Sequence, residues 1–95
     1  MAENASNRIV ITVLGKNRPG IVAGISRVLG DENVDIRDIT QSIIEDIFTM
    51  TMIADISAAA SDFTTLQERL SAAGESIGVS VQIQREDVFN YMYRL

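Results

Sequence analysis

The chain has 95 residues, a formal net charge of −5, and neither cysteine nor histidine. This length favours one domain with a modest core, and the acidic balance argues against nucleic acid or an anionic membrane surface as a partner. Without cysteine or histidine, disulfides, a thiolate nucleophile, a Ser-His-Asp triad and the commonest transition-metal ligands are excluded. No apolar run reaches the ~20 residues of a membrane span, and the start lacks a signal-peptide pattern. We therefore expect a cytoplasmic protein with no cofactor and no bound metal.

The beginning of the chain predicts a tail, a strand, a loop and a helix. Residues 1–7 are small and polar and are expected to form a loose tail before a single domain over residues 8–95. The β-branched, apolar run Arg8 to Leu14 is typical of a strand. Apolar residues from Ile21 to Leu29 recur at helical spacing, so we expect a helix from about Pro19 to Glu32. Proline suits the first helical turn because no helical hydrogen bond is lost there.

The middle of the chain predicts two strands joined by a hairpin. Val34 to Ile44 is typical of a strand, but its apolar phase changes near Asp38, which indicates a bulge or a strong twist. Glu45 and Asp46 form a short polar break. Ile47 to Ile56 then shows the clearest alternation of side chains in the sequence, and it predicts the third strand.

The rest of the chain predicts a helix, a fourth strand and a short terminal helix. Ser61 or Asp62 is expected to cap the second helix. Its predicted buried stripe consists of Phe63, Leu66, Leu70, Ala73 and Ile77. Val79 to Arg85 alternates again and predicts the fourth strand. The last ten residues are expected to be helical, with Tyr91 and Tyr93 serving in packing or in dimer contacts.

This order of elements, βαββαβ, predicts an α+β, ferredoxin-like sandwich. Two right-handed split βαβ units give a four-stranded antiparallel sheet with both helices on one face, followed by the terminal helix. The face under the helices should hold Ile9, Ile11, Val13, Phe48, Met50, Met52, Val81 and Ile83. The opposite face should hold Val10, Thr12, Leu14, Thr49, Thr51, Ile53, Gln82 and Gln84. Because this open face is half apolar, we expect it to attract a partner, and a homodimer is the simplest one.

The stretch Gly15 to Ile21 is where the residue types suggest more than folding. The first amides of a helix have no partner within the helix, and the positive end of the helix dipole lies behind them. A small anion such as a carboxylate suits that position. Arg18 is either a clamp for the anion or a solvated surface residue. The alternative for the whole stretch is a strand-to-helix turn with no ligand.

The loop and the element order together resemble the ACT domain, a small regulatory fold that binds amino acids, usually at an interface between domains. The resemblance covers roughly residues 8–95. It rests on Gly15-Lys16-Asn17-Arg18-Pro19-Gly20-Ile21-Val22-Ala23 and on Asn33-Val34-Asp35-Ile36. The ending, Phe89 to Leu95, resembles that of the short stand-alone ACT proteins of unassigned function found in bacteria and archaea.

The resemblance implies a non-enzymatic regulatory module that binds an amino acid or a small carboxylate as a homodimer. The residues that match the family's ligand site are Gly15, Asn17, Arg18, Pro19, Gly20, Ile21, Asn33 and Asp35. Asn33 and Asp35 would complete the site from the facing subunit. Family members that bind amino acids often carry an acidic residue where Asn17 stands, so Asp35 or Asp38 of a partner would have to neutralise the ligand's ammonium group.

Two other interpretations follow from the same residues. The first is a homodimeric protein-interaction module with no ligand, whose target protein the sequence does not identify. The second is a hard-metal site built from Asp35, Asp38, Glu45 and Asp46. We do not favour the metal site, because the first two acidic residues flank the predicted bulge and the other two lie at the far turn.

Overall fold

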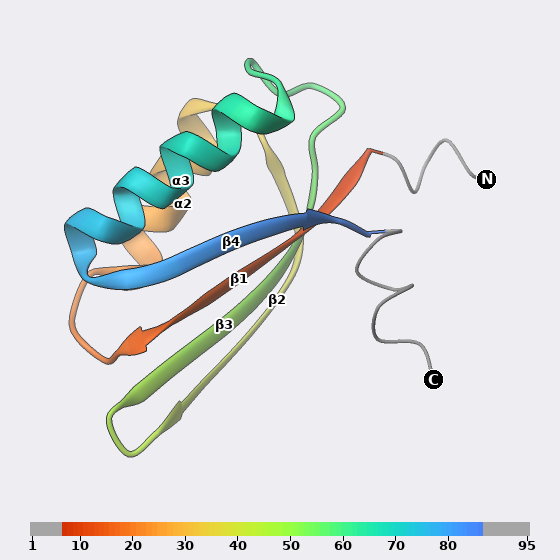
Figure 1. Ribbon diagram of the computed structural model, residues 1–95. Coiled ribbons are helices and arrows are strands. Elements are labelled where there is room, and N and C mark those ends of the chain that lie inside the picture. The colour runs from red at the N-terminus through yellow and green to blue at the C-terminus, as the bar shows by residue number, and fades with distance from the viewer. Residues whose placement is uncertain (1–6, 87–95) are drawn as a thin grey trace.

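The backbone forms four strands and two helices over residues 7–86, which are the residues that the computed structural model describes (Figure 1). The elements are β1 (Arg8–Lys16), α2 (Ile21–Asp31), β2 (Asp35–Ile44), β3 (Ile47–Asp55), α3 (Phe63–Ile77) and β4 (Val79–Arg85). Residues 1–6 of the predicted tail and residues 87–95 of the predicted terminal helix lie outside the described residues. The predicted βαββαβ order is confirmed.

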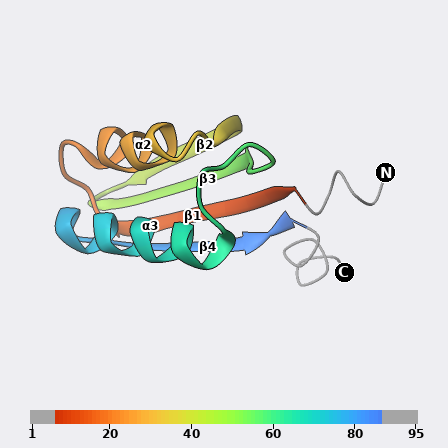
Figure 2. The same cartoon turned by 90° about the horizontal axis from the view of Figure 1, so that it is seen from above.

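The strands form an antiparallel sheet in the order β2-β3-β1-β4. Both helices cover the same face, with α2 on the β2 side and α3 on the β4 side (Figure 2). The predicted α+β, ferredoxin-like sandwich is therefore confirmed. Neither described helix is long and apolar enough to cross a membrane.

The core lies between the helices and the sheet face that the alternation of strand residues predicted. All eight residues expected on that face are buried: Ile9, Ile11, Val13, Phe48, Met50, Met52, Val81 and Ile83. Ile21, Ile25 and Leu29 of α2 pack onto them, as do Leu66 and Leu70 of α3. Met50 and Met52 are therefore core residues, as their position beside Phe48 on β3 suggested.

The other sheet face is only partly exposed, since Thr12, Thr49, Ile53 and Gln84 are half-buried. Leu14, Thr51 and Gln82 are exposed there, as predicted. Val10 lies on the same face but is only 3% exposed. The open face is therefore less bare near the start of β1 than the strand alternation alone indicates.

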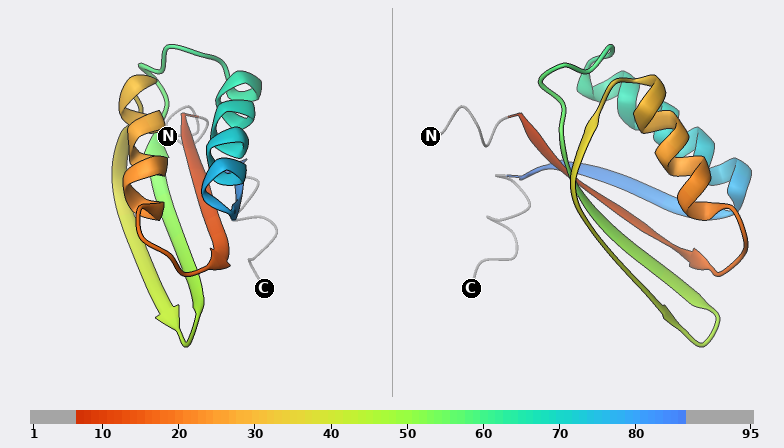
Figure 3. Two further views of the ribbon diagram at one scale, coloured as in Figure 1. Left: turned by 90° about the vertical axis from the view of Figure 1, so that its left-hand side faces the viewer. Right: turned by 180° about the vertical axis from the view of Figure 1, so that it is seen from behind.

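β2 is an edge strand in which all ten residues are exposed. Its pairing with β3 shifts register between Ile36 and Asp38, which confirms the bulge predicted near Asp38. The hairpin of β2 and β3 extends beyond the helices (Figure 3). Ile44 and Ile47 pair at its tip, and Glu45 in the turn has a left-handed φ of 56°. The apolar side chains of β2 are thus left outside the core.

Candidate functional site

The loop between β1 and α2 makes a sharp turn at Pro19 and Gly20 before the helix begins. Gly20 is the N-cap residue and has a left-handed φ of 89°. Because this backbone conformation is not helical, α2 begins at Ile21 rather than near Pro19 as predicted. Pro19 therefore belongs to the turn and not to the first helical turn.

The N-terminus of α2 is open to an anion. Gly20 is the N-cap residue of α2 and offers no side chain that could accept a hydrogen bond from the first amides of the helix. The first turn of α2 also contains no acidic residue. The first amide with a helical partner is that of Gly24, which donates to the carbonyl of Gly20 at 2.9 Å. By contrast, Asp62 caps α3 by accepting a hydrogen bond from the Thr65 amide at 2.9 Å. The two helices of one small domain thus differ in whether their N-terminal amides are satisfied.

Asn17 ties the loop to the hairpin tip. Its backbone amide donates to the carbonyl of Asp46 in the β2–β3 turn at 2.6 Å. This amide is therefore not available to a ligand in this arrangement. The contact places the loop beside the end of β2.

Arg18 and Gly15 both face the corner where α3 meets β4. Arg18 is exposed, and its guanidinium lies against Gly78, the C-cap residue of α3. A Cβ at Gly78 would be 3.2 Å from Arg18 Cζ, and a Cβ at Gly15 would be 2.8 Å from Val79 Cγ1. The end of a helix carries partial negative charge, so a cation is favourable there. The sequence did not suggest this position for Arg18, because it depends on a helix end sixty residues away in the chain.

Asn33 and Asp35 lie at the other end of α2 from the loop. Asn33 has a left-handed φ of 60° and donates from Nδ2 to the Ala58 carbonyl at 3.0 Å. The 11 residues of α2 separate it from the loop by about 16 Å at 1.5 Å per residue. Within one chain, the structure therefore brings together Gly15 to Ile21 but does not bring Asn33 or Asp35 to them.

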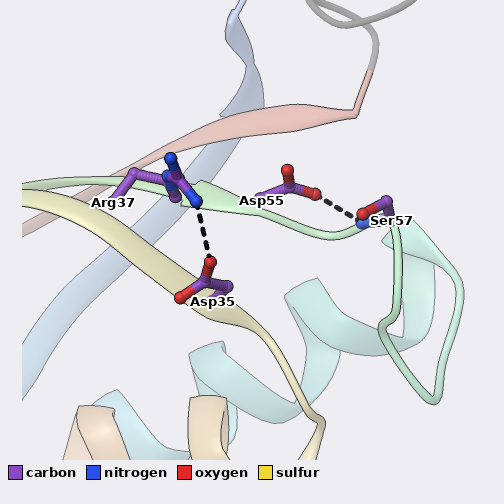
Figure 4. Close-up of polar contacts among 4 residues, drawn as sticks. All are labelled: Asp35, Arg37, Asp55 and Ser57. Carbon is purple, nitrogen blue, oxygen red and sulfur yellow. Dashed lines mark hydrogen bonds and ion pairs between the residues drawn. The ribbon is translucent and has the colours of Figure 1, made fainter.

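The start of β2 carries an exposed ion pair. Asp35 Oδ2 accepts from Arg37 Nη1 at 3.1 Å (Figure 4). Asp55 pairs with Asp35 across the strands, and its Oδ1 accepts from the Ser57 amide at 2.8 Å (Figure 4). The Ser57 hydrogen bonds lower the pKa of Asp55, and the charges of Arg37 and Arg8 add to this effect. Asp35 thus already has a cationic partner on its own strand.

The acidic residues considered as a metal site are far apart. Asp35 and Asp38 lie near the start of β2, while Glu45 and Asp46 form the turn at its other end. Asp38 Oδ1 accepts from the Ile39 amide at 2.9 Å. Over residues 7–86, no group of three or more acidic side chains is placed to hold a metal ion.

Glu32 is a buried acidic residue that the sequence pattern does not single out. It is 2% exposed, forms an ion pair with Arg69 of α3, and accepts the Ala60 amide on its backbone carbonyl at 2.8 Å. Ser61 and Arg69 lower the pKa of the Glu32 carboxyl against the effect of burial, while its Oε1 has no hydrogen-bond partner among the described residues. Glu32 thereby joins the end of α2 to α3 just ahead of Asn33. Glu32 directly follows the end of α2 in the sequence, but an exposed glutamate often occupies the same position, so the sequence alone did not predict its burial.

Comparison with known proteins places these features in a family. The ACT domain family model matches residues 7–84. A UPF0237 protein of Methanocaldococcus jannaschii is 51% identical over 89 residues, which cover 94% of this chain and 99% of that relative. The structure of an ACT domain protein from Streptococcus pneumoniae is 36% identical, covers 90% of this chain and 97% of that one, and has a TM-score of 0.77. A putative glycine cleavage system transcriptional repressor is similar in fold alone, with 24% identity over 82% of this chain and 44% of that one, and a TM-score of 0.72.

Proposed function

The chain belongs to the ACT domain family, and from that premise we propose that it is a non-enzymatic regulatory module that binds an amino acid or a small carboxylate at a dimer interface. The loop Gly15 to Ile21 of one copy holds the carboxylate. Asn33 and Asp35 of a second copy complete the site. The absence of histidine and cysteine from the sequence supports a binding role over a catalytic one.

The observation that carries this proposal is the open N-terminus of α2. The turn at Gly20 presents the first amides of the helix without a capping side chain, whereas α3 is capped by Asp62. Unpaired amides at the positive end of a helix dipole are suited to a carboxylate. A capping side chain at position 20 would occupy the same space, and glycine leaves it free.

The arrangement of the sheet edge supports a second copy of the chain as the source of Asn33 and Asp35 in the proposed site. β2 is an edge strand, and its exposed apolar side chains are Ile36, Ile39, Ile43 and Ile44. Such an edge is a template for pairing with another strand. If two β2 edges pair antiparallel about a twofold axis, the end of one β2 lies beside the start of the other. The hydrogen bond from Asn17 to Asp46 keeps the loop at that end, and so brings it toward Asp35 of the partner.

A ligand-free interaction dimer is the alternative, and two observations favour it. Asp35 is neutralised by Arg37 of its own strand, and the Asn17 amide is used by Asp46. An ammonium group would therefore have to compete with Arg37 for the Asp35 carboxylate.

A ligand without an ammonium group, such as a 2-oxo acid, avoids the competition with Arg37 for Asp35.

A thermal-shift screen tests the proposal. The purified protein is heated with each of the twenty amino acids and with common 2-oxo acids, and its oligomeric mass is measured by light scattering. We expect one or two compounds to raise the melting temperature, because a ligand at 100 times its Kd stabilises the folded state by about 2.7 kcal/mol. A screen with no rise and a stable dimer would favour the interaction module.

Two substitutions at Gly20 make the test specific. Gly20→Asp places a negative charge in the carboxylate position, where a Cβ meets no atom within 4 Å, so the variant should fold but lose binding. Gly20→Ala introduces the same backbone strain without the charge and should retain binding. The proposed site is wrong if the Asp variant folds, dimerises and binds the selected compound with unchanged affinity.

A further inference from the structure

A groove runs along the side of the sheet opposite β2, between α3 and β4. Its volume is about 610 Å³. α3 lines it with a stripe that includes Glu68, Ala72 and Glu75, and β4 lines it with Val79, Ser80 and Val81. The proposed ligand site uses none of these residues, so the groove needs a separate explanation.

One wall of the groove is the outer edge of β4, which no other described strand pairs with. Among the described strands, β4 pairs with β1 alone, in continuous register from Val79 to Arg85. Proteins usually protect such edges with proline, lysine or a bulge, yet Val79 to Ile83 contains no charged residue and no proline. The start of β4 is therefore suited to accept the main chain of another extended segment.

The other wall of the groove is acidic. Glu68 and Glu75 are seven residues apart on α3, so they lie on the same face of the helix. Neither forms an ion pair with any of residues 7–86. Two carboxylates with no cationic partner among the described residues, beside the edge of β4, favour a segment that carries positive charge.

We propose that an extended basic segment of another protein docks here as a fifth strand on β4. Side chains on one side of a strand repeat about every 6.6 Å, and Glu68 and Glu75 are about 10.5 Å apart along the helix axis. Three alternate lysine or arginine residues therefore span both carboxylates. The apolar part of the groove, formed by Ala72, Val79 and Val81, accommodates the aliphatic stems of those side chains.

A second copy of the chain is a poorer occupant. Two β4 edges that paired about a twofold axis would bring both α3 helices side by side, with Glu68 and Glu75 of each copy close together. Like charges in that arrangement oppose association. The docking does not depend on the proposed ligand or on the β2 interface, and it leaves β4 accessible in a dimer formed through β2.

The test is an NMR titration of the ¹⁵N-labelled full chain with a synthetic peptide. The probe is the capped peptide Thr-Lys-Val-Lys-Val-Lys-Thr, and the control peptide has glutamate at the three lysine positions. We expect the lysine peptide to shift amides of residues 79–82 and 64–75, with an affinity that falls as salt is added. The glutamate peptide should produce no such shifts.

Charge-reversal variants show whether binding depends on the carboxylates of the groove or only on the net charge of the protein. Glu68→Lys with Glu75→Lys should weaken binding by roughly tenfold or more. Asp31→Lys with Glu45→Lys changes the net charge equally on exposed residues outside the groove and should retain binding. Ala72→Trp fills the groove without changing charge and should also weaken binding.

Three results would overturn this inference. The first is binding of the glutamate peptide as tightly as the lysine peptide. The second is unchanged affinity in the Glu68 and Glu75 variant. The third is a set of shifts in β4 and α3 that depends on protein concentration without peptide, which would identify a second copy as the occupant.

Discussion

At the scale of single residues, the conformation of Gly20 determines how the loop meets α2. Its φ of 89° is unfavourable for residues with a Cβ, while nothing lies within 4 Å of where that Cβ would be. The requirement for glycine therefore comes from the backbone and not from lack of space. Because the free space and the backbone strain at Gly20 are distinct, substitutions there can test the strain and the proposed anion site independently.

We expect Gly20→Ala to lower the free energy of unfolding by about 1 kcal/mol, measured by urea denaturation. Gly30→Ala is the matched control. Gly30 also has no atom within 4 Å of its Cβ position, but it lies within α2 and has no left-handed φ. That variant should be more stable than the native chain by about 0.5 kcal/mol, because alanine favours the helix and restricts the unfolded chain. Equal effects of the two substitutions would contradict the role assigned to the Gly20 backbone.

A second residue, Glu32, makes stability depend on pH. Ser61 and Arg69 lower the pKa of its carboxyl in the folded protein. A lowered folded pKa means that the contribution is present above the unfolded value and is lost as the pH falls through the folded value. Asp55 and Asp62 also have lowered pKa values and act in the same direction. The native chain should therefore lose stability in acid, below about pH 4.5.

The variant Glu32→Gln isolates this contribution. It should be less stable than the native chain at neutral pH, because the Gln amide does not replace the charge facing Arg69. The difference between the two chains should shrink as the pH falls, as measured by urea denaturation at several pH values. Arg69→Gln keeps the Ser61 contact and should remove only part of the dependence. A difference that is constant across pH would mean that ionisation of Glu32 contributes nothing.

At the scale of elements, β2 differs from the other strands because it leaves its apolar residues outside the core. Ile39 and Ile43 are 44% and 56% exposed. Leu14 of β1, on the open face, is 54% exposed. The molecule thus offers two apolar surfaces to a second copy, the β2 edge and the open face. The sequence alone did not distinguish between them.

Charge substitutions distinguish these two surfaces. We expect Ile39→Lys with Ile43→Lys to convert the proposed dimer to a monomer, measured by light scattering, with little change in secondary structure because both side chains are exposed. Leu14→Lys is the control for the open face and should leave the proposed dimer intact. Dissociation by Leu14→Lys alone would move the interface to the open face and remove the support for a shared site at β2.

The same elements show what the sequence predicts and where it fails. The alternation in β3 identified Phe48, Met50 and Met52 as core residues, because a strand with one buried face repeats every two residues. The bounds of β4 also agree with the prediction. The start of α2 was wrong by two residues, since proline is compatible with both a turn and a first helical turn. Which strands form the edges depends on the sheet order, which the local pattern does not contain.

At the scale of the whole molecule, the candidate site divides into two parts that one chain keeps apart. The sequence predicted the residues of both parts from the family resemblance. The position of Arg18 against Gly78 and the hydrogen bond from Asn17 to Asp46 depend on contacts between distant segments, so local patterns gave no indication of them. The tail, the terminal helix and the extent of the single domain remain predictions.

If the loop of one copy and Asp35 of the other form each ligand site, mixed dimers should recover binding that each variant lacks. Gly20→Asp damages the loop, and Asp35→Asn damages the other part, so each homodimer contains two damaged sites. A heterodimer of the two variants has one site with both defects and one site with none. Calorimetry with the compound selected by the thermal-shift screen should then give one site per heterodimer at native affinity. If each chain binds its ligand alone, every site in the mixture carries one defect, and mixing restores no native binding.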